Sequence, residues 1–495
     1  MKWISVCVAL ILLFGFSSQN VIAQSLTGTT GLVTIPTAEM PEDGEISFGF
    51  SIINKEHSAY SYAHGGQHHE VANFITLGYL PFLEITPRLT RLLHFPQPQA
   101  IGDRMVSIRL RVLKESAIFP SVVCGVHDPF GASINFSASY LVASKSFSAS
   151  NCRMGIHLGY GGDWLKAREA KGHQFLGLFG GVSLSPSPFI TLMLEHDAEK
   201  LNGGVRLSIF DRLELTGAFL GFDAFSGGIS YKRPLHGQDK VASADEWPFQ
   251  VDVLFHPQFK AQFGNFDDPI GVESQVNLAP EVRAALWKGM TVSGQLIIPL
   301  QNELEEEGNH WRPGLLTVSQ FLRLPRDTFA SATLGYFTRH RYGGDLEVRK
   351  YFANRRCAIG ANLGYTGYAL YREGIWYYSG VDLLTTFLNA GYWFPRFDLT
   401  LTATYGKFLY GDKGWRFDIL RRFGEVDIGF FALTTETGSN GGFNFSIPFP
   451  RKSLSVGPVR IGPAKEFPWE YRYKGLPNNG IRYKTGSSVD ELERR

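Results

Sequence analysis

The chain has 495 residues, and its 48 Lys and Arg nearly balance its 46 Asp and Glu, so the formal net charge is only +2. This balance argues against a nucleic-acid partner, for which we expect a basic patch. Beyond residue 23 the cysteines are Cys124, Cys152 and Cys357, and an odd number of scattered cysteines argues against a disulfide framework.

The first 23 residues have the pattern of a secretory signal peptide. Lys2 supplies a positive start, residues 4–16 are apolar, and Val21-Ile22-Ala23 provides a cleavage site before Gln24. The apolar stretch is too short to span a bilayer, which needs ~20 residues. We therefore predict export by a cleavable signal peptide at 1–23, followed by a lead-in segment at 24–43.

Residues 44–235 alternate apolar with polar or small side chains. In the first segment Ile46, Phe48, Phe50 and Ile52 share one face of a strand, because successive side chains point to opposite faces. Repeated alternation without a membrane helix predicts a closed β-barrel in lipid, since an open sheet edge cannot exist in hydrocarbon. The predicted strands are 45–53, 72–80, 82–93, 104–113, 119–126, 134–143, 152–161, 174–184, 188–197, 203–210, 212–220 and 226–233.

The connections between these strands alternate in length. Tight turns such as Pro81 and 211–212 alternate with longer polar loops such as 54–71 and 162–173. Outer-membrane barrels carry short turns on the periplasmic side and long loops outside. The pattern therefore predicts that the barrel starts from the periplasm.

A polar, proline-bracketed stretch at 236–248 interrupts this rhythm and has the composition of a linker. Alternation resumes over 249–449, and the tail at 450–495 is rich in Lys, Arg, Gly and Pro without alternation. One barrel of about 26 strands and two of about twelve both fit, and the linker favours two. The predicted fold class is all-β, with two tandem transmembrane antiparallel β-barrels in the cell outer membrane and a periplasmic C-terminal tail.

The alternation of the first predicted barrel assigns polar side chains to its interior. The candidates for lining the lumen are Arg109, Arg111, His157, Glu195, Asp197, Arg206 and Glu214. Such groups can brace the wall or hold a plug, or they can line a solute path. Bracing is favoured, because a small barrel fills with its own side chains. Glu195 and Asp197 share a face as a glycosidase pair would, but many strand pairs do so.

Two loop clusters carry residue types that bind metal ions. Histidines at close spacing suit a transition metal, and glutamates in a run suit calcium. No further framework fixes the geometry, so solvated loops are the favoured interpretation, and we predict no bound metal and no cofactor. The residues concerned are His57, His64, His68, His69, Glu303, Glu305, Glu306 and Glu307.

Several motifs resemble those of the YjbH family of outer-membrane proteins associated with exopolysaccharide. They are Gly28–Ala38 with the following Pro41–Gly44, Tyr140–Lys145, Glu195–Asp197 and Arg341–Asp345. The resemblance implies outer-membrane barrels linked to export or maturation of exopolysaccharide. It supplies no catalytic residues, so we expect a non-enzymatic protein.

A second resemblance concerns assembly of the barrel. Asn440, Gly442, Phe445 and Ile447 resemble the closing-strand signal that the barrel assembly machinery reads. The expected partners are therefore this machinery, outer-membrane lipid and lipopolysaccharide, the exopolysaccharide and its periplasmic export proteins. The chain could serve as a conduit or as a docking scaffold with plugged barrels. A general porin is an alternative, and a surface glycan hydrolase is a weaker one.

Overall fold

The computed structural model describes residues 23–58, 68–93, 101–129, 137–149, 152–165, 174–210, 212–235, 250–263, 272–304, 309–372, 374–449, 453–472, 478–486 and 488–489. The predicted linker at 236–248 and nearly all of the predicted signal peptide lie outside these ranges. The chain divides into two compact units, Met1–Pro234 and Leu235–Arg495. Within the described ranges, no helix has the length and apolar character needed to cross a membrane.

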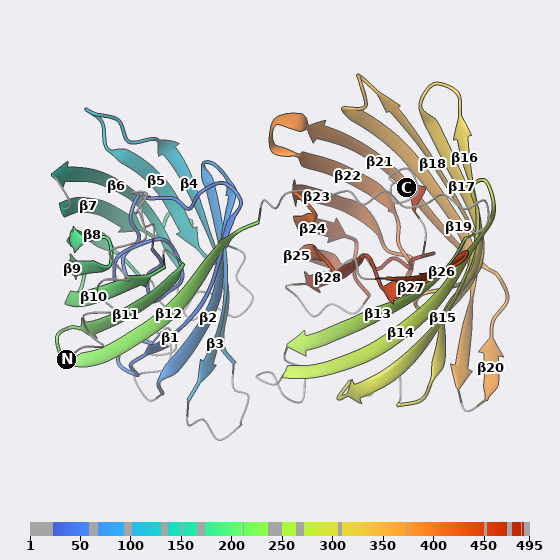
Figure 1. Cartoon of the computed structure of the whole chain (residues 1–495), viewed down its shortest axis with the longest axis horizontal. Helices are drawn as coiled ribbons and strands as arrows, with labels where there is room; N and C mark the ends of the chain where they lie inside the picture. The colour runs from blue at the N-terminus through green and yellow to red at the C-terminus, as the bar shows by residue number, and fades with distance from the viewer. Residues whose placement is uncertain are drawn as a thin grey trace. The chain divides into compact units, whose positions relative to one another are not determined.

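The first unit is a closed barrel of twelve antiparallel strands that follow one another in chain order (Figure 1). β1 and β12 close it, with a register that runs from Glu45↔Pro234 to Ile52↔Gly227. The predicted all-β antiparallel barrel is therefore confirmed for this unit. Its strands are β1 (Glu45–Ile53), β2 (Glu70–Leu80), β3 (Leu83–Leu92), β4 (Ile101–Leu113), β5 (Ser121–His127), β6 (Ala138–Ala149), β7 (Cys152–Gly162), β8 (Gly177–Ser187), β9 (Ile190–His196), β10 (Leu201–Ile209), β11 (Leu213–Leu220) and β12 (Ala224–Pro234).

Most large apolar side chains of this barrel's strands point outward, whereas small and polar side chains, with a few apolar ones that pack on the interior, point inward. On β1 the side chains of Phe48, Phe50 and Ile52 are exposed, whereas Ser47 and Ser51 are buried. A soluble protein buries its large apolar side chains instead. The arrangement is the one that a barrel surrounded by lipid requires.

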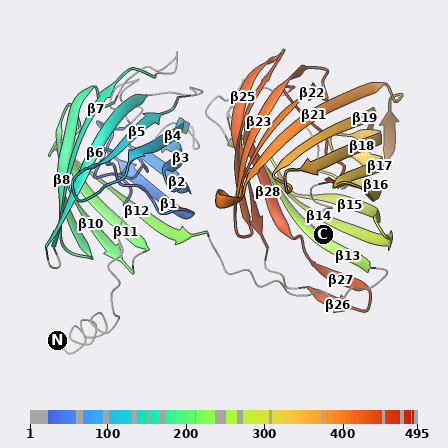
Figure 2. The same cartoon turned by 90° about the horizontal axis from the view of Figure 1, so that it is seen from above.

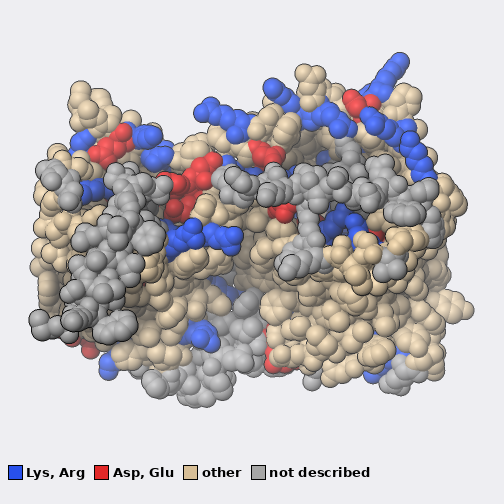
Figure 3. Space-filling model, in the orientation of Figure 1, with Lys and Arg blue, Asp and Glu red and all other residues tan. Residues whose placement is uncertain are grey.

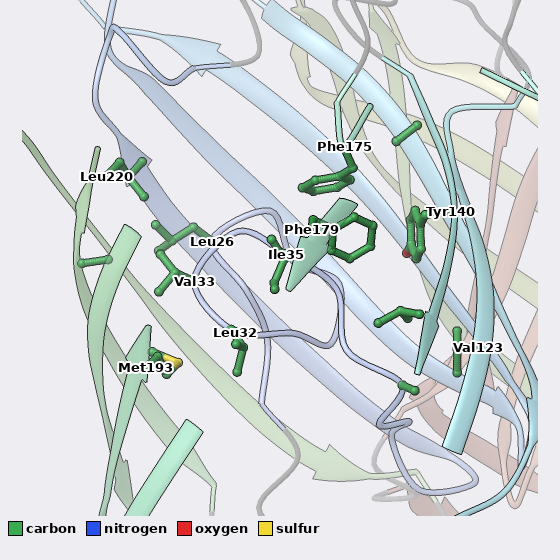
Figure 4. Close-up of a cluster of buried hydrophobic side chains, with 14 of the residues drawn as sticks. Leu26, Leu32, Val33, Ile35, Val123, Tyr140, Phe175, Phe179, Met193 and Leu220 are labelled. Atoms are coloured by element: carbon green, nitrogen blue, oxygen red, sulfur yellow. The ribbon is translucent and has the colours of Figure 1, made fainter. Parts of the chain in front are cut away.

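The lead-in segment lies inside this barrel. Its apolar residues Leu26, Leu32, Val33 and Ile35 are almost completely buried and pack with inward side chains of the strands (Figure 4). Short bridges Gln24↔Thr30 and Gly31↔Pro36 fold the segment back on itself. We call residues 23–43 the N-terminal plug. The sequence pattern did not predict this position, because the segment has no strand or helix period.

The second unit is a sixteen-stranded sheet that curls round on itself (Figure 2). Seven strands from β13 to β19 and five from β21 to β25 form an antiparallel meander, and β20 pairs with β19 off this path. The predicted dozen corresponds to this meander, and the sheet holds four strands more. The strands are β13 (Gln250–Phe263), β14 (Val272–Trp287), β15 (Met290–Asn302), β16 (Arg312–Leu324), β17 (Thr328–Phe337), β18 (Arg341–Phe352), β19 (Cys357–Arg372), β20 (Ile375–Tyr378), β21 (Leu383–Phe394), β22 (Leu399–Lys407), β23 (Lys413–Phe423), β24 (Val426–Thr435), β25 (Gly438–Pro448), β26 (Leu454–Val456), β27 (Val459–Pro463) and β28 (Glu466–Arg472). A 3-10 turn, η2 (Pro395–Phe397), precedes β22.

The C-terminal strands join the first and last strands of this meander. β27 pairs in parallel with β13, and β28 pairs antiparallel with β25. Where the chain crosses from one to the other, the Ala464 N–H donates to the Phe255 carbonyl at 2.9 Å. The rings of Phe259 on β13 and Trp469 on β28 lie 6.2 Å apart. We call residues 459–472 the seam strand.

The seam strand corrects the prediction of a tail without alternation at 450–495. Phe467, Trp469 and Tyr471 alternate with polar residues and prolines along β28. They lie opposite Ile447, Phe445 and Phe443 of β25, so they continue the row of apolar side chains on that strand. The charged and proline-rich flanks masked this short period-two pattern. In Figure 3 much of the visible surface of the second unit carries no Lys, Arg, Asp or Glu, as expected for strands with apolar outer faces.

The seam strand also changes the interpretation of the closing-strand signal. β25, which contains Asn440, Gly442, Phe445 and Ile447, is not the last strand, because β28 covers its outer edge. Gly442 has a local reason to be glycine. A Cβ at this position would lie 1.9 Å from the Tyr471 carbonyl oxygen of β28.

This contact predicts that Gly442→Val destabilises the second unit. Overpacking costs about 1–3 kcal/mol, and each kcal/mol lowers the melting temperature by about 2–4 °C for a unit of this size. The neighbouring Gly441→Val is the matched control, because the nearest atom to its Cβ, the Phe431 oxygen, is 3.3 Å away. Thermal unfolding followed by circular dichroism compares the two. Equal melting temperatures would contradict the seam geometry.

Candidate functional site

Glu195 is the main acceptor for the N-terminal plug. Its side chain projects from β9 into the barrel and is almost fully buried. It accepts hydrogen bonds from the Val33 and Thr34 backbone N–H groups, each at 2.8 Å, and from the Thr34 hydroxyl at 2.6 Å. The Asn202 amide donates to it at 3.2 Å. Hydrogen bonds to a charged acceptor are strong, so this carboxylate holds the turn of the plug.

Arg206 on β10 binds backbone carbonyl groups of the plug. Its guanidinium donates to the carbonyl oxygens of Gln24 at 2.9 Å, Gly31 at 3.1 Å and Leu32 at 2.8 Å. Gly31 and Leu32 are neighbours in the turn of the plug, and Gln24 lies near the start of the segment. All three bonds run from Nη2, so its two hydrogens are shared among the three carbonyls and join the start of the plug to its turn.

Arg109 on β4 and Glu84 on β3 form an ion pair whose two side chains are both 0% exposed. Arg109 also donates to the carbonyls of Thr37 and Glu39. Glu84 accepts from the Thr30 backbone N–H at 3.1 Å. The pair therefore holds the plug from a third side. Glu84 is not among the predicted lumen residues, although it follows the same alternation as Arg109.

The other predicted lumen residues act on the wall and the turns. The His157 ring bonds to Ser144 at 2.8 Å, and Ser144 in turn accepts from the Ala38 N–H of the plug at 2.7 Å. Glu214 pairs with Lys232 at 3.3 Å. The two remaining residues lie at the barrel ends. Arg111 donates to the Pro81 carbonyl, and Asp197 caps a turn by accepting from the Glu199 and Lys200 N–H groups.

Apolar packing completes the filling of the first barrel. Phe175, Phe179 and Tyr140 belong to the same buried cluster as Ile35 of the plug, and Figure 4 shows Phe179 between Ile35 and Tyr140. A small cavity of about 30 Å³ remains beside Thr34 and is also lined by residues of the loop ends. A cavity of this size holds about one water molecule. The described interior of the first barrel is therefore a packed core with a bound plug.

The inner face of the second sheet carries polar groups that water can reach. Arg416 on β23 pairs with Asp418 at 2.8 Å and with Glu470 of the seam strand at 3.0 Å. The side chains of Asp418 and Glu470 are 27% and 34% exposed. A second cluster joins Glu281 to His256 at 3.0 Å and to Arg283 at 2.9 Å. Glu281 itself is only 2% exposed, so it is the Arg416 pairs, with their part-exposed carboxylates, that contrast with the fully buried Arg109–Glu84 pair of the first barrel.

A segment after the seam strand crosses this inner face. We call residues 478–486 and 488–489 the C-terminal segment. The Asn479 amide donates to the Gly438 carbonyl at 2.9 Å, and the Leu409 N–H donates to the Ile481 carbonyl at 3.0 Å. Farther along, the Lys484 N–H donates to the Thr338 hydroxyl at 2.7 Å. The segment therefore runs from the end of β24 to the end of β17.

Comparison with known proteins places the chain in a family. The family described as "Exopolysaccharide biosynthesis protein YbjH" matches residues 23–204 and 228–454. The chain belongs to the YjbH family. The match covers most of both units and confirms the resemblance seen in the motifs of the sequence.

Comparison with individual proteins gives one relative aligned over a short region and one solved structure with a low TM-score. An Escherichia coli (strain K12) protein named "Uncharacterized lipoprotein YjbH" is 30% identical over 146 residues, which are 28% of this chain and 19% of that protein. The aligned region thus spans about a fifth of that relative. The siderophore receptor PirA from Acinetobacter baumannii shares 8% identity with a TM-score of 0.19, over 84% of this chain and 75% of that one.

Of the loop residues considered as metal ligands, the structure describes His57, His68, His69 and Glu303. His57 lies 3.5 Å from Asp223, and His64 and Glu305–Glu307 lie outside the described residues. Among the residues that the structure describes, no three His, Cys, Asp or Glu side chains form a group that could hold a metal ion. The two units of this YjbH-family chain thus differ in their interiors. The first holds the N-terminal plug, and the second has a polar inner face.

Proposed function

We propose that this YjbH-family chain is an outer-membrane protein of exopolysaccharide secretion in which the second unit provides the polymer's route or docking surface. The first barrel is a plugged unit that anchors the protein. One observation carries this division of roles. In the first barrel, Glu195, Arg206 and the Arg109–Glu84 pair are buried and bonded to the N-terminal plug, whereas Asp418 and Glu470 on the inner face of the second unit are 27% and 34% exposed.

Placement in the outer membrane is supported by the surface of both sheets. Large apolar side chains are exposed along the strands, such as Phe48 and Phe50 on β1 and Trp415 and Phe417 on β23. A sheet with such an outer face is stable in lipid when its strands close. The predicted export signal is compatible with this placement. Lipid and lipopolysaccharide are then the surrounding partners, and the barrel assembly machinery inserts the chain.

The polar inner face supports a role with polysaccharide. Exopolysaccharide presents many hydroxyl groups, and Arg416, Asp418 and Glu470 offer donors and acceptors that water reaches. Periplasmic export proteins would deliver the polymer at the short-turn end. A general porin is less favoured, because the described interior of the first barrel is filled.

We also propose that the chain acts without catalysing a reaction on the sugar. The hydrolase alternative uses Glu195 and Asp197 as an acid and nucleophile pair. Glu195 is bonded to the plug backbone, and Asp197 caps the turn before Lys200. Both carboxylates are thus engaged in the structure of the first barrel. These contacts favour a route or docking surface over a hydrolase.

Chemical modification inside the second unit tests the route. We expect Glu470→Cys, in a chain whose native cysteines are replaced by alanine, to react with a polyethylene-glycol maleimide in cells. The attached polymer should lower exopolysaccharide release at least about tenfold, because it occupies the inner face. Release is measured as polysaccharide in the medium, and labelling as a gel shift.

Glu199→Cys, on an exposed turn of the first barrel, is the matched control and should be labelled without loss of release. Normal release from labelled Glu470→Cys cells would overturn the proposed route. Failure of Glu470→Cys to react would overturn it as well, since the inner face would then be closed to water.

A further inference from the structure

Tyr483 of the C-terminal segment occupies a shaped position on the inner face of the second unit. Its hydroxyl donates to the Asp345 carboxylate of β18 at 2.7 Å and lies 3.4 Å from the Thr385 hydroxyl of β21. Its ring stacks on Phe337 of β17, with centroids 5.3 Å apart and planes inclined by 9°. Three strands of the wall therefore contribute to one position.

The wall is shaped to make room for this ring. A Cβ on Gly364 of β19 would lie 1.7 Å from the Tyr483 hydroxyl oxygen, so only glycine leaves the space. The Asn362 amide donates to the other oxygen of Asp345 at 2.8 Å and fixes the carboxylate. Burial, with the nearby Asp345 carboxylate, raises the pKa of the Tyr483 hydroxyl above its usual range. The hydroxyl therefore stays protonated and donates to Asp345.

These groups have the chemistry of a sugar subsite. A pyranose ring is close in size to a phenol ring, presents C–H groups that pack on an aromatic face, and carries hydroxyls that donate to a carboxylate. Phe337 supplies the aromatic face, Asp345 the acceptor and Thr385 a second polar group. Ligand sites combine an apolar surface with a few placed polar groups in this way.

We propose that Phe337, Asp345, Gly364 and Thr385 form a glycan subsite on the inner wall of the second unit, and that the chain's own Tyr483 occupies it. The C-terminal segment is then an intramolecular competitor of the polysaccharide. This inference rests on the proposed function, because it identifies the place at which the polymer contacts that wall.

Competition of this kind predicts that removing the Tyr483 side chain increases the affinity for oligosaccharide. A site that is free about a tenth of the time binds its ligand about tenfold more weakly than the free site does. Tyr483→Ala should therefore bind oligosaccharides at least about tenfold more tightly than the unaltered chain. Tyr483→Ala combined with Asp345→Asn should lose that gain, because the substitution removes the negative charge and replaces one of the two accepting oxygens with an NH2 donor.

The probe is a set of oligosaccharides made by partial acid hydrolysis of the exopolysaccharide from the producing cells. Titration calorimetry on the full chain in detergent measures their affinity. Tyr405→Ala is the control, because the Tyr405 side chain is exposed on the outer face of β22. This variant should bind the oligosaccharides as the unaltered chain does. Circular dichroism melts verify that each variant is folded.

Two results would overturn the subsite. In the first, Tyr483→Ala binds no more tightly than the unaltered chain. In the second, Tyr483→Ala with Asp345→Asn keeps the full gain. Either can occur while modified Glu470→Cys still blocks release, in which case the proposed route stands and this subsite fails. A tenfold gain with normal release from modified cells would instead keep the subsite and remove the route.

Discussion

A chain that ends at Phe449 should fail to assemble its second unit, whereas one that ends at Arg472 should assemble. The shorter chain lacks the seam strand, which pairs five residues with β13 and seven with β25. Without it both edges of the meander would be open, and unpaired backbone groups in hydrocarbon cost several kcal/mol each. The expected loss is therefore the whole folded unit.

Heat-modifiable migration on gels, with protease resistance of residues 250–449, measures this difference. The chain that ends at Arg472 is the matched control, because it lacks the C-terminal segment but keeps the seam strand. Equal resistance of the two truncated chains would show that the meander closes without β27 and β28. Secretion by the chain ending at Phe449 would contradict the seam in the same way.

Glu195→Ala should release the N-terminal plug of the first barrel. The substitution leaves the Val33 and Thr34 N–H groups and the Thr34 hydroxyl without their acceptor. Of these donors the Val33 N–H is buried, whereas Thr34 is half-buried beside the water-sized cavity. A buried donor without an acceptor costs about 1–3 kcal/mol, so the plugged state is destabilised by at least about 1 kcal/mol. That value corresponds to an opening at least about fivefold more frequent.

The rate of thiol labelling of Val33→Cys measures how often the plug opens, because Val33 is completely buried in the plugged barrel. The native Cys124, Cys152 and Cys357 are first replaced by alanine. Glu214→Ala is the matched control, since Glu214 is an inward carboxylate that bonds to Lys232 and Ser230 of the wall. Labelling that is equally slow in both variants would mean that Glu195 does not hold the plug.

Each unit therefore has a terminal segment bound to its interior, with different consequences. The N-terminal plug meets Glu195, Arg206 and Arg109 with backbone groups and leaves little space. The C-terminal segment contacts the second sheet through separate positions such as Asn479 and Tyr483. An inner face with water-exposed charges remains beside it. This difference is why the route is proposed for the second unit.

Much of the fold could be predicted from the sequence because strand alternation is a local property. Ile46, Phe48 and Phe50 reveal their common face within a single segment, whatever the rest of the chain does. The same rule places Arg109 and Glu195 on the inner side of their strands. The twelve strands of the first barrel follow from repeated use of this rule, and the structure confirms that barrel.

The positions of three segments could not be predicted from the sequence, because they depend on contacts between residues far apart in the chain. These segments are the N-terminal plug, the seam strand and the C-terminal segment. Val33 meets Glu195 across 162 residues, and Tyr483 meets Asp345 across 138. No local period marks either contact. The sequence by itself determined which side chains face inward and which face outward. Only the tertiary structure decided what occupies each interior, since backbone groups and single side chains from distant segments satisfy the inward polar residues.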